Sequence, residues 1–128
     1  MGSDKATKII SNVPGVSIRC TEEAVEVYFL KTLNYDEWHE LEGYIQKMMN
    51  TGTTYFIFHL QRLDNFTSYD IGMWITLNTQ ITNQHGTLEF ILGHSSTVRK
   101  FMKLSKLDQV FSITAEDPIE NIDENPCV

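Results

Sequence analysis

Two hydroxyl side chains, those of Thr67 and Ser68, stand where an apolar run gives way to an amphipathic stretch. The run is Tyr55 to Leu60, and the stretch is Ile71 to Ile81. The first turn of a helix has free backbone N–H groups and a partial positive charge, so a hydroxyl there can cap the helix and a phosphate there is tolerated. The sequence therefore predicts either a helix cap or a phosphorylation site, and leaves both open.

A serine at a strand-to-helix turn could also be the nucleophile of a hydrolase. That turn needs a glycine two residues to either side of the serine, but Phe66 and Asp70 occupy these positions. His59 belongs to the preceding apolar run, where a histidine is more often part of the core. The four histidines show no tight ligand spacing, so a metal site is not expected. We predict no catalytic residue, no metal and no cofactor.

The charge balance excludes several kinds of partner. The chain has 10 basic and 17 acidic residues and a formal net charge of −7. Such a charge repels phosphate backbones and anionic lipid surfaces unless a basic patch is concentrated locally. We therefore expect neither nucleic acid nor membrane as a partner. The two cysteines, Cys20 and Cys127, form no disulfide framework, which favours a reducing, cytoplasmic compartment.

Length and composition predict one domain. The chain has 128 residues, of which 41% are hydrophobic, enough to bury a single core without disulfides or metal. Because the start is polar, we expect residues 1–12 to be a flexible N-terminal segment. It shows no signal-peptide pattern. The domain is expected over residues 13–122. Residues 123–128 are too polar and too few to pack, and are expected to be a disordered tail.

Hydrophobic periodicity predicts the elements of the first half. Two short alternating segments, Val16 to Cys20 and Ala24 to Leu30, are typical of paired strands. Apolar residues at three-and-four spacing predict a helix over Asp36 to Met49. The run Thr54 to Leu60 is apolar on both faces, as in a central strand with helices on both sides.

The second half continues this alternation. We predict a helix over Ile71 to Ile81, a strand over Thr87 to Leu92, a third helix capped by Ser95 or Ser96, a last strand over Leu107 to Ile113, and one or two helical turns over Ala115 to Ile122. Strands that alternate with helices imply right-handed crossovers and a largely parallel sheet. The predicted class is α/β, with a mixed, mostly parallel sheet of five strands and about four helices.

Three segments carry a resemblance to a known family. Phe58 to Gly72, with the sequence FHLQRLDNFTSYDIG, resembles the central segment of STAS domains, the family of bacterial anti-sigma factor antagonists. Gly86 to Leu92 is similar to the family's fourth strand, and Val98 to Phe111 is similar to its third helix and closing strand. The resemblance covers about Val13 to Ile122. It implies a STAS-like fold and a protein-binding role without catalysis.

The family's usual signature at the central turn is Asp-Ser-Ser-Gly, and here Thr67, Ser68, Tyr69 and Asp70 occupy the four positions. In antagonists of this family a partner serine kinase phosphorylates the first serine. The resemblance therefore implies this role for Ser68, with Thr67 as the lesser candidate. We expect Asp70 to add bulk and negative charge where the family has glycine. Asn34 replaces the last residue of the family's Gly-x-Leu-Asp and keeps its capping ability.

The predicted function is regulated protein binding in a bacterial partner-switching pathway. The resemblance implies a serine kinase or anti-sigma factor that binds when Ser68 is unmodified, and a serine phosphatase that restores this state. An alternative is a constitutive scaffold subunit in which exposed aromatic residues such as Tyr69 anchor the contacts. A third is a sensor of a small ligand. The oligomeric state stays open. The residues expected to contact the partner are Asn34, Thr67, Ser68, Tyr69, Asp70, Met73, His94, Ser95 and Ser96.

Overall fold

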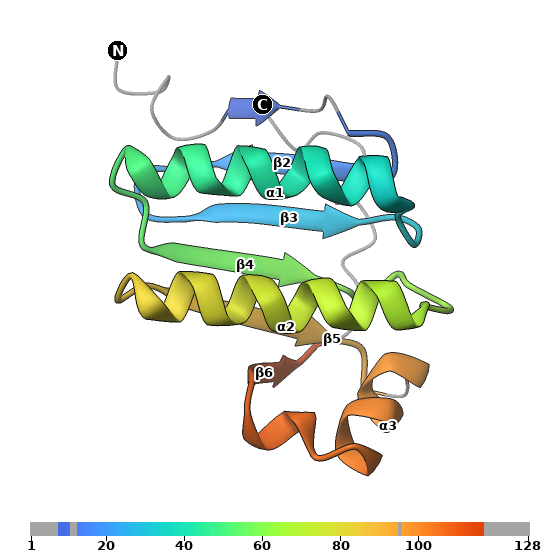
Figure 1. Ribbon diagram of the computed structural model, residues 1–128. Coiled ribbons are helices and arrows are strands. Elements are labelled where there is room, and N and C mark those ends of the chain that lie inside the picture. Colours follow the sequence, from blue (N-terminus) through green and yellow to red (C-terminus); the bar gives the residue numbers. More distant parts are fainter. Residues whose placement is uncertain (1–7, 11–12, 95, 117–128) are drawn as a thin grey trace.

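Figure 1 shows the computed structural model, which describes residues 8–10, 13–94 and 96–116. The described part contains six strands, three α-helices and a short 3₁₀ helix. Their bounds, in chain order, are β1 Lys8–Ile10, β2 Val16–Cys20, β3 Val25–Phe29, α1 Tyr35–Asn50, β4 Tyr55–His59, α2 Ser68–Asn83, β5 Thr87–Leu92, α3 Thr97–Leu104, η2 Leu107–Gln109 and β6 Ser112–Ala115.

One mixed sheet organises these elements. Its strands lie in chain order from β1 to β6. The pairs β1–β2 and β2–β3 are antiparallel, and the pairs β3–β4, β4–β5 and β5–β6 are parallel. The predicted α/β class with a mostly parallel sheet is confirmed. The sheet has one strand more than predicted, because β1 lies within the segment 1–12 and three residues are too few to show an alternating pattern.

The core fills the space between this sheet and the helices. In Figure 1, α1 and α2 lie across the same face of the sheet. They contribute Trp38 and Trp74, both fully buried. Phe58 in β4 lies at the centre, with its ring centroid 5.1 Å from that of Phe29 and 5.6 Å from that of Phe90. These aromatic contacts join three neighbouring strands beneath the two helices.

The opposite face of the central strands carries several polar side chains. Side chains alternate along a strand, so Glu26 and Tyr28 point away from α1 and α2. The hydroxyl of Tyr28 donates to Glu26 Oε1 at 2.9 Å, and His59 Nε2 lies 2.8 Å from the same oxygen. The hydrogen bond with His59 lowers the pKa of Glu26, whereas burial raises the pKa of Tyr28 to about 12. The prediction for β4 is therefore right as to its central place, but α1 and α2 cover one face only.

The end of the described chain differs from the prediction. Leu107, expected to begin the last strand, begins η2, and β6 starts five residues later. Lys106 adopts a left-handed conformation with φ of 65°, and the N–H groups of Val110 and Phe111 both donate to Leu107 O at 2.9 Å. Apolar residues at this three-and-four spacing form a turn, not a strand. Helical turns are expected over residues 115–122, but Ala115 ends β6 and Glu116 N donates to Leu92 O at 2.7 Å, so these two residues continue the pairing with β5. Residues 117–122 and the tail 123–128 lie outside the described residues.

Within the described residues, three α-helices are present instead of about four. α1 is one residue longer at each end than predicted, and its buried side chains recur with helical spacing. No helix in the part that the structure describes is long and apolar enough to cross a membrane.

Candidate functional site

The first turn of α2 begins earlier than the sequence predicts. Its first residue is Ser68, not Ile71. Thr67 is the N-cap: its hydroxyl accepts from Asp70 N at 3.1 Å, and Asp70 Oδ2 accepts from Thr67 N at 2.8 Å. This reciprocal pair is a capping box. Of the two hydroxyls at the turn, therefore, Thr67 caps the helix and Ser68 does not.

Ser68 is left with a free side chain. The residue is exposed, and its hydroxyl has no hydrogen bond in the described part of the chain. It occupies the first helical position, where backbone N–H groups point out of the helix end without an internal partner. A phosphate on this oxygen would meet the positive end of the α2 dipole. The cap and the modifiable hydroxyl are thus separate residues, so a change at Ser68 leaves the cap intact.

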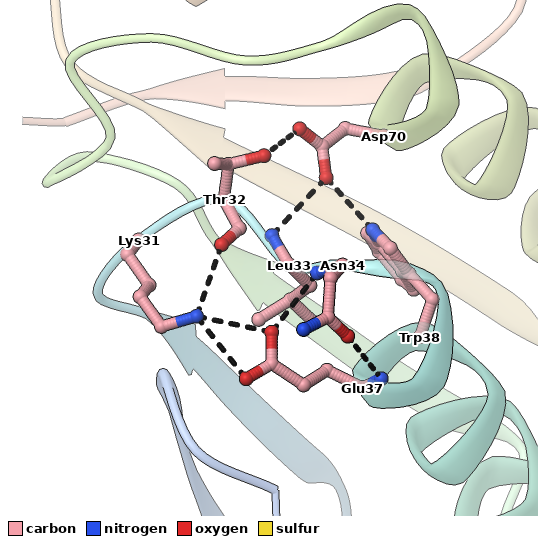
Figure 2. A network of polar contacts seen from close by, with 7 residues as sticks. All are labelled: Lys31, Thr32, Leu33, Asn34, Glu37, Trp38 and Asp70. Atoms are coloured by element: carbon pink, nitrogen blue, oxygen red, sulfur yellow. Dashed lines mark hydrogen bonds and ion pairs between the residues drawn. The ribbon is translucent and has the colours of Figure 1, made fainter.

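Asp70 points into the protein, contrary to our expectation. Its side chain is 1% exposed, and it is the one charged residue buried in the described part of the chain. Figure 2 shows its carboxylate between two segments: Oδ1 accepts from Trp38 Nε1 at 2.7 Å and from Leu33 N at 3.4 Å, and Oδ2 accepts from the hydroxyl of Thr32. Because these donors surround it, Asp70 adds no charge to the outer surface of the turn. It does not offer a direct contact to a partner.

These hydrogen bonds join two turns that are far apart in sequence. Thr32 and Leu33 belong to the loop between β3 and α1, and Trp38 belongs to the first turns of α1. Asp70 belongs to α2. A buried carboxylate is stable only when donors compensate the loss of water, and here each oxygen receives more than one. The network therefore fixes the first turn of α2 against the β3–α1 loop.

Asn34 has the capping role that the sequence predicts. Its Oδ1 accepts from Glu37 N at 2.8 Å, and Glu37 Oε1 accepts from Asn34 N at 2.9 Å, so α1 also starts with a capping box. Lys31 Nζ lies 3.0 Å from Glu37 Oε1 (Figure 2). The hydrogen bond from the Asn34 backbone, with that from Lys31, lowers the pKa of Glu37. Both helix starts near Asp70 are thus rigidly capped.

Two tyrosines form an exposed aromatic surface beside Ser68. Tyr35 is 63% exposed and Tyr69 is 40% exposed, with ring centroids 5.9 Å apart. His39 stacks on Tyr35 at a centroid distance of 6.0 Å. Exposed tyrosines are typical anchors of protein interfaces. The sequence favours Tyr69 as the surface candidate, and the structure places the ring of Tyr35 against it and that of His39 against Tyr35.

The other residues that the sequence predicts to contact a partner lie in different environments. Met73 is buried on the inner side of α2, so it supports the turn from below. His94 is exposed, Ser96 is the N-cap of α3 with its Oγ accepting from Arg99 N at 3.0 Å, and Ser95 lies outside the described residues. The loops after β3, β4 and β5 all leave the same edge of the sheet (Figure 1), because these strands are parallel. The candidate site is therefore the edge at which α1, α2 and α3 begin.

The inward contacts of Asp70 are the main feature that sequence reasoning misses. The spacing of Thr67 and Asp70 matches a capping box, so it could have indicated the earlier helix start. Nothing local to residue 70 indicates Thr32 or Trp38 as donors, because they lie more than thirty residues away and meet Asp70 only in the folded sheet.

The sequence matches no family model and no curated protein. Solved structures are nevertheless similar over almost the whole chain. A putative anti-sigma factor antagonist from Thermotoga maritima has a TM-score of 0.63 and 18% identity, and the match covers 94% of this chain and 92% of that one. The unphosphorylated anti-sigma factor antagonist SpoIIAA, known from Bacillus, has a TM-score of 0.61 and 17% identity, with coverage of 96% and 100%. An anti-sigma factor antagonist from Mycobacterium paratuberculosis has a TM-score of 0.61 and 11% identity, with coverage of 96% and 95%.

These similarities confirm the STAS-like fold that the sequence resemblance implies. At identities below 20% they concern the fold, and function has to be argued from the site itself.

Proposed function

We propose that this chain is a protein-binding module of the anti-sigma factor antagonist type, and that phosphorylation of Ser68 switches its binding. The observation that carries the proposal is the position of Ser68: exposed, first in α2, and free of the capping bonds that hold its neighbours. The fold is that of anti-sigma factor antagonists, one of which is known in a phosphorylated form, and this supports the same use of the turn.

The physical effect of a phosphate at Ser68 falls on binding more than on folding. At a helix N-terminus a negative charge changes stability by about 1 kcal/mol, against a total of about 5 to 15 kcal/mol for a domain. An added charge of about −2 that is buried without a partner in an interface costs several kcal/mol. Every 1.4 kcal/mol or so is a tenfold loss of affinity. The modified protein therefore stays folded and releases its partner.

The partners that this mechanism requires are a serine kinase or anti-sigma factor, which binds unmodified Ser68, and a serine phosphatase, which removes the phosphate. The module itself is not a catalyst in this proposal. His59, the histidine nearest to Ser68 in sequence, is held by Glu26 and stacks on Tyr28 at a centroid distance of 4.0 Å on the far face of the sheet. No histidine in the described part of the chain is hydrogen-bonded to Ser68.

A constitutive scaffold is the second candidate, and the exposed pair of Tyr35 and Tyr69 favours it. Contacts anchored by two tyrosines need no phosphate, because burial of their rings alone can drive association. In this case the charge at Ser68 would matter little unless it lies inside the interface.

The deciding experiment compares the proteins retained from host lysate by the wild type, Ser68→Ala and Ser68→Asp, with identification by mass spectrometry. Partner switching predicts that a serine kinase is retained by the first two and lost by Ser68→Asp. Ser112→Asp is a matched control, because it adds the same charge at an exposed position on β6. The same lysate with ATP should add one phosphate to the wild type and none to Ser68→Ala.

Retention of the same proteins by all variants, with no phosphate on the wild type, would exclude the switch. The double variant Tyr35→Ala/Tyr69→Ala then tests the scaffold, which predicts that these proteins are lost.

A further inference from the structure

The segment of α3 and η2, residues 97–110, has a charge opposite to that of the rest of the molecule. We call this segment the α3 knob. It holds four of the ten basic residues and one of the seventeen acidic residues, which leaves six basic and sixteen acidic residues for the rest. The charged residues of the knob are Arg99, Lys100, Lys103, Lys106 and Asp108. The basic patch that the overall charge of −7 conceals is therefore concentrated in fourteen consecutive residues.

The knob also exposes large apolar side chains. Leu104 is 85% exposed and Val110 is 61% exposed. Leu104 lies one turn after Lys100 on α3 and shares its outward face, because Val98 and Met102 occupy the buried face. Lys100, Lys103 and Lys106 lie close to Leu104 in sequence, so the knob combines exposed apolar and basic side chains.

The basic side chains of the knob are available for a partner. In the part of the chain that the structure describes, none of the four forms an ion pair, whereas Lys31 does. Arg99 donates to the backbone oxygen of His94 at 3.0 Å. Lys100, Lys103 and Lys106 are exposed. The knob lies at the β6 end of the sheet, away from α1 (Figure 1).

We propose that the α3 knob is a docking surface for an anionic lipid membrane. Lysines around an exposed leucine fit this occupant, because lysine stems lie along the apolar region while their ammonium groups reach the lipid phosphates. A single-stranded nucleic acid would favour exposed aromatic rings, which the knob lacks since Phe101 is half-buried. A protein partner would favour arginines and a hollow for the leucine, and lysine is depleted in such interfaces. The contact is peripheral and reversible.

This inference goes beyond the proposed function and does not depend on it. A membrane contact would concentrate the module at a surface, and the test below uses neither Ser68 nor its partners. Failure of one proposal therefore leaves the other standing.

The test is co-sedimentation of the full chain with vesicles of phosphatidylcholine alone, or of phosphatidylcholine and phosphatidylglycerol in equal parts. We expect binding to the second only, weakened by added salt. Each lysine near an anionic surface contributes about fivefold in affinity, so Lys103→Glu/Lys106→Glu should lose at least about 25-fold. Leu104→Ser should bind more weakly at equal charge. Lys47→Glu, which reverses one charge at an exposed lysine on α1, is the control for a single charge reversal outside the knob and should retain most binding.

Two outcomes would overturn the proposal. One is no binding of the wild type to the anionic vesicles at low salt. The other is equal binding by the wild type and Lys103→Glu/Lys106→Glu, with circular dichroism showing that both are folded. Tighter binding to a DNA duplex or to polyglutamate than to the vesicles, at the same salt, would likewise assign the knob to another class of partner and overturn the lipid assignment.

Discussion

At the scale of single residues, the Asp70 carboxylate is buried and stabilises the start of α2 through hydrogen bonds, instead of adding charge to the surface. The carboxylate accepts hydrogen bonds from Trp38 Nε1 and Leu33 N. It also accepts from the Thr32 hydroxyl and from Thr67 N. We expect Asp70→Asn to destabilise the fold by about 1 to 3 kcal/mol, because the amide has an NH₂ group where one oxygen accepts hydrogen bonds. Urea denaturation measures this change. Asp64→Asn, at an exposed carboxylate, is the control and should change stability by less than about 0.5 kcal/mol.

An Asp70→Asn variant as stable as the wild type would show that the network contributes nothing. The indole N–H resonance of Trp38 offers a second observation, because its donor bond to Asp70 is 2.7 Å long in the wild type. That resonance should shift in Asp70→Asn and stay in place in Asp64→Asn.

The neighbouring hydroxyls Thr67 and Ser68 have different roles, which substitution separates. Thr67→Ala removes the N-cap of α2 and should cost about 1 kcal/mol. Ser68→Ala removes a hydroxyl that has no hydrogen bond to any residue the structure describes, and should change stability by a few tenths of a kcal/mol at most. Thermal unfolding of the two variants beside the wild type measures both. Equal losses of stability in the two variants would mean that Ser68 also caps α2. The hypothesis that its hydroxyl is free for modification would then be wrong.

At the scale of elements, the hydrogen bond between Glu26 in β3 and His59 in β4 makes the pairing of these strands sensitive to acid. The hydrogen bond with His59 lowers the pKa of Glu26 in the folded state. A lowered pKa contributes stability that is present above the unfolded-state value, about 4.5, and is lost as the pH falls through the folded-state value. We expect the difference in unfolding free energy between the wild type and Glu26→Gln to shrink from pH 6 to pH 3. Urea denaturation at both pH values measures it. A difference that stays constant would contradict a stabilising Glu26 carboxylate.

The order of the elements could be predicted from the sequence, whereas several of their ends could not. Apolar periodicity reflects burial, so it locates β4 and the body of α2 correctly. It misses the first turn of α2, since Thr67 and Asp70 are held there by hydrogen bonds and not by an apolar stripe. It also mistakes Leu107 for the start of a strand, although Leu107, Val110 and Phe111 have the three-and-four spacing of a turn.

The candidate site could be predicted in position but only partly in detail. The strand-to-helix turn at Ser68 follows from local pattern and from the family resemblance. The inward direction of Asp70 does not, because a charged residue beside a helix start is usually solvent-exposed and its donors lie in another loop. The proximity of Tyr35 to Tyr69 could not be predicted either, because it depends on two separate helices starting at one edge of the sheet.

At the scale of the whole molecule, the chain outside the α3 knob has sixteen acidic residues and only six basic ones. Folding brings these like charges together, so screening should stabilise the native state. We expect the thermal midpoint to rise by a few degrees when sodium chloride increases from about 20 to 200 mM, where the screening length shortens markedly. Lys103→Glu/Lys106→Glu changes the net charge from −7 to −11 and should steepen this dependence. Asp64→Asn with Glu40→Gln, which gives −5, should flatten it. The same salt response in all three proteins would mean that the separation of charge between knob and body has no energetic consequence for the fold.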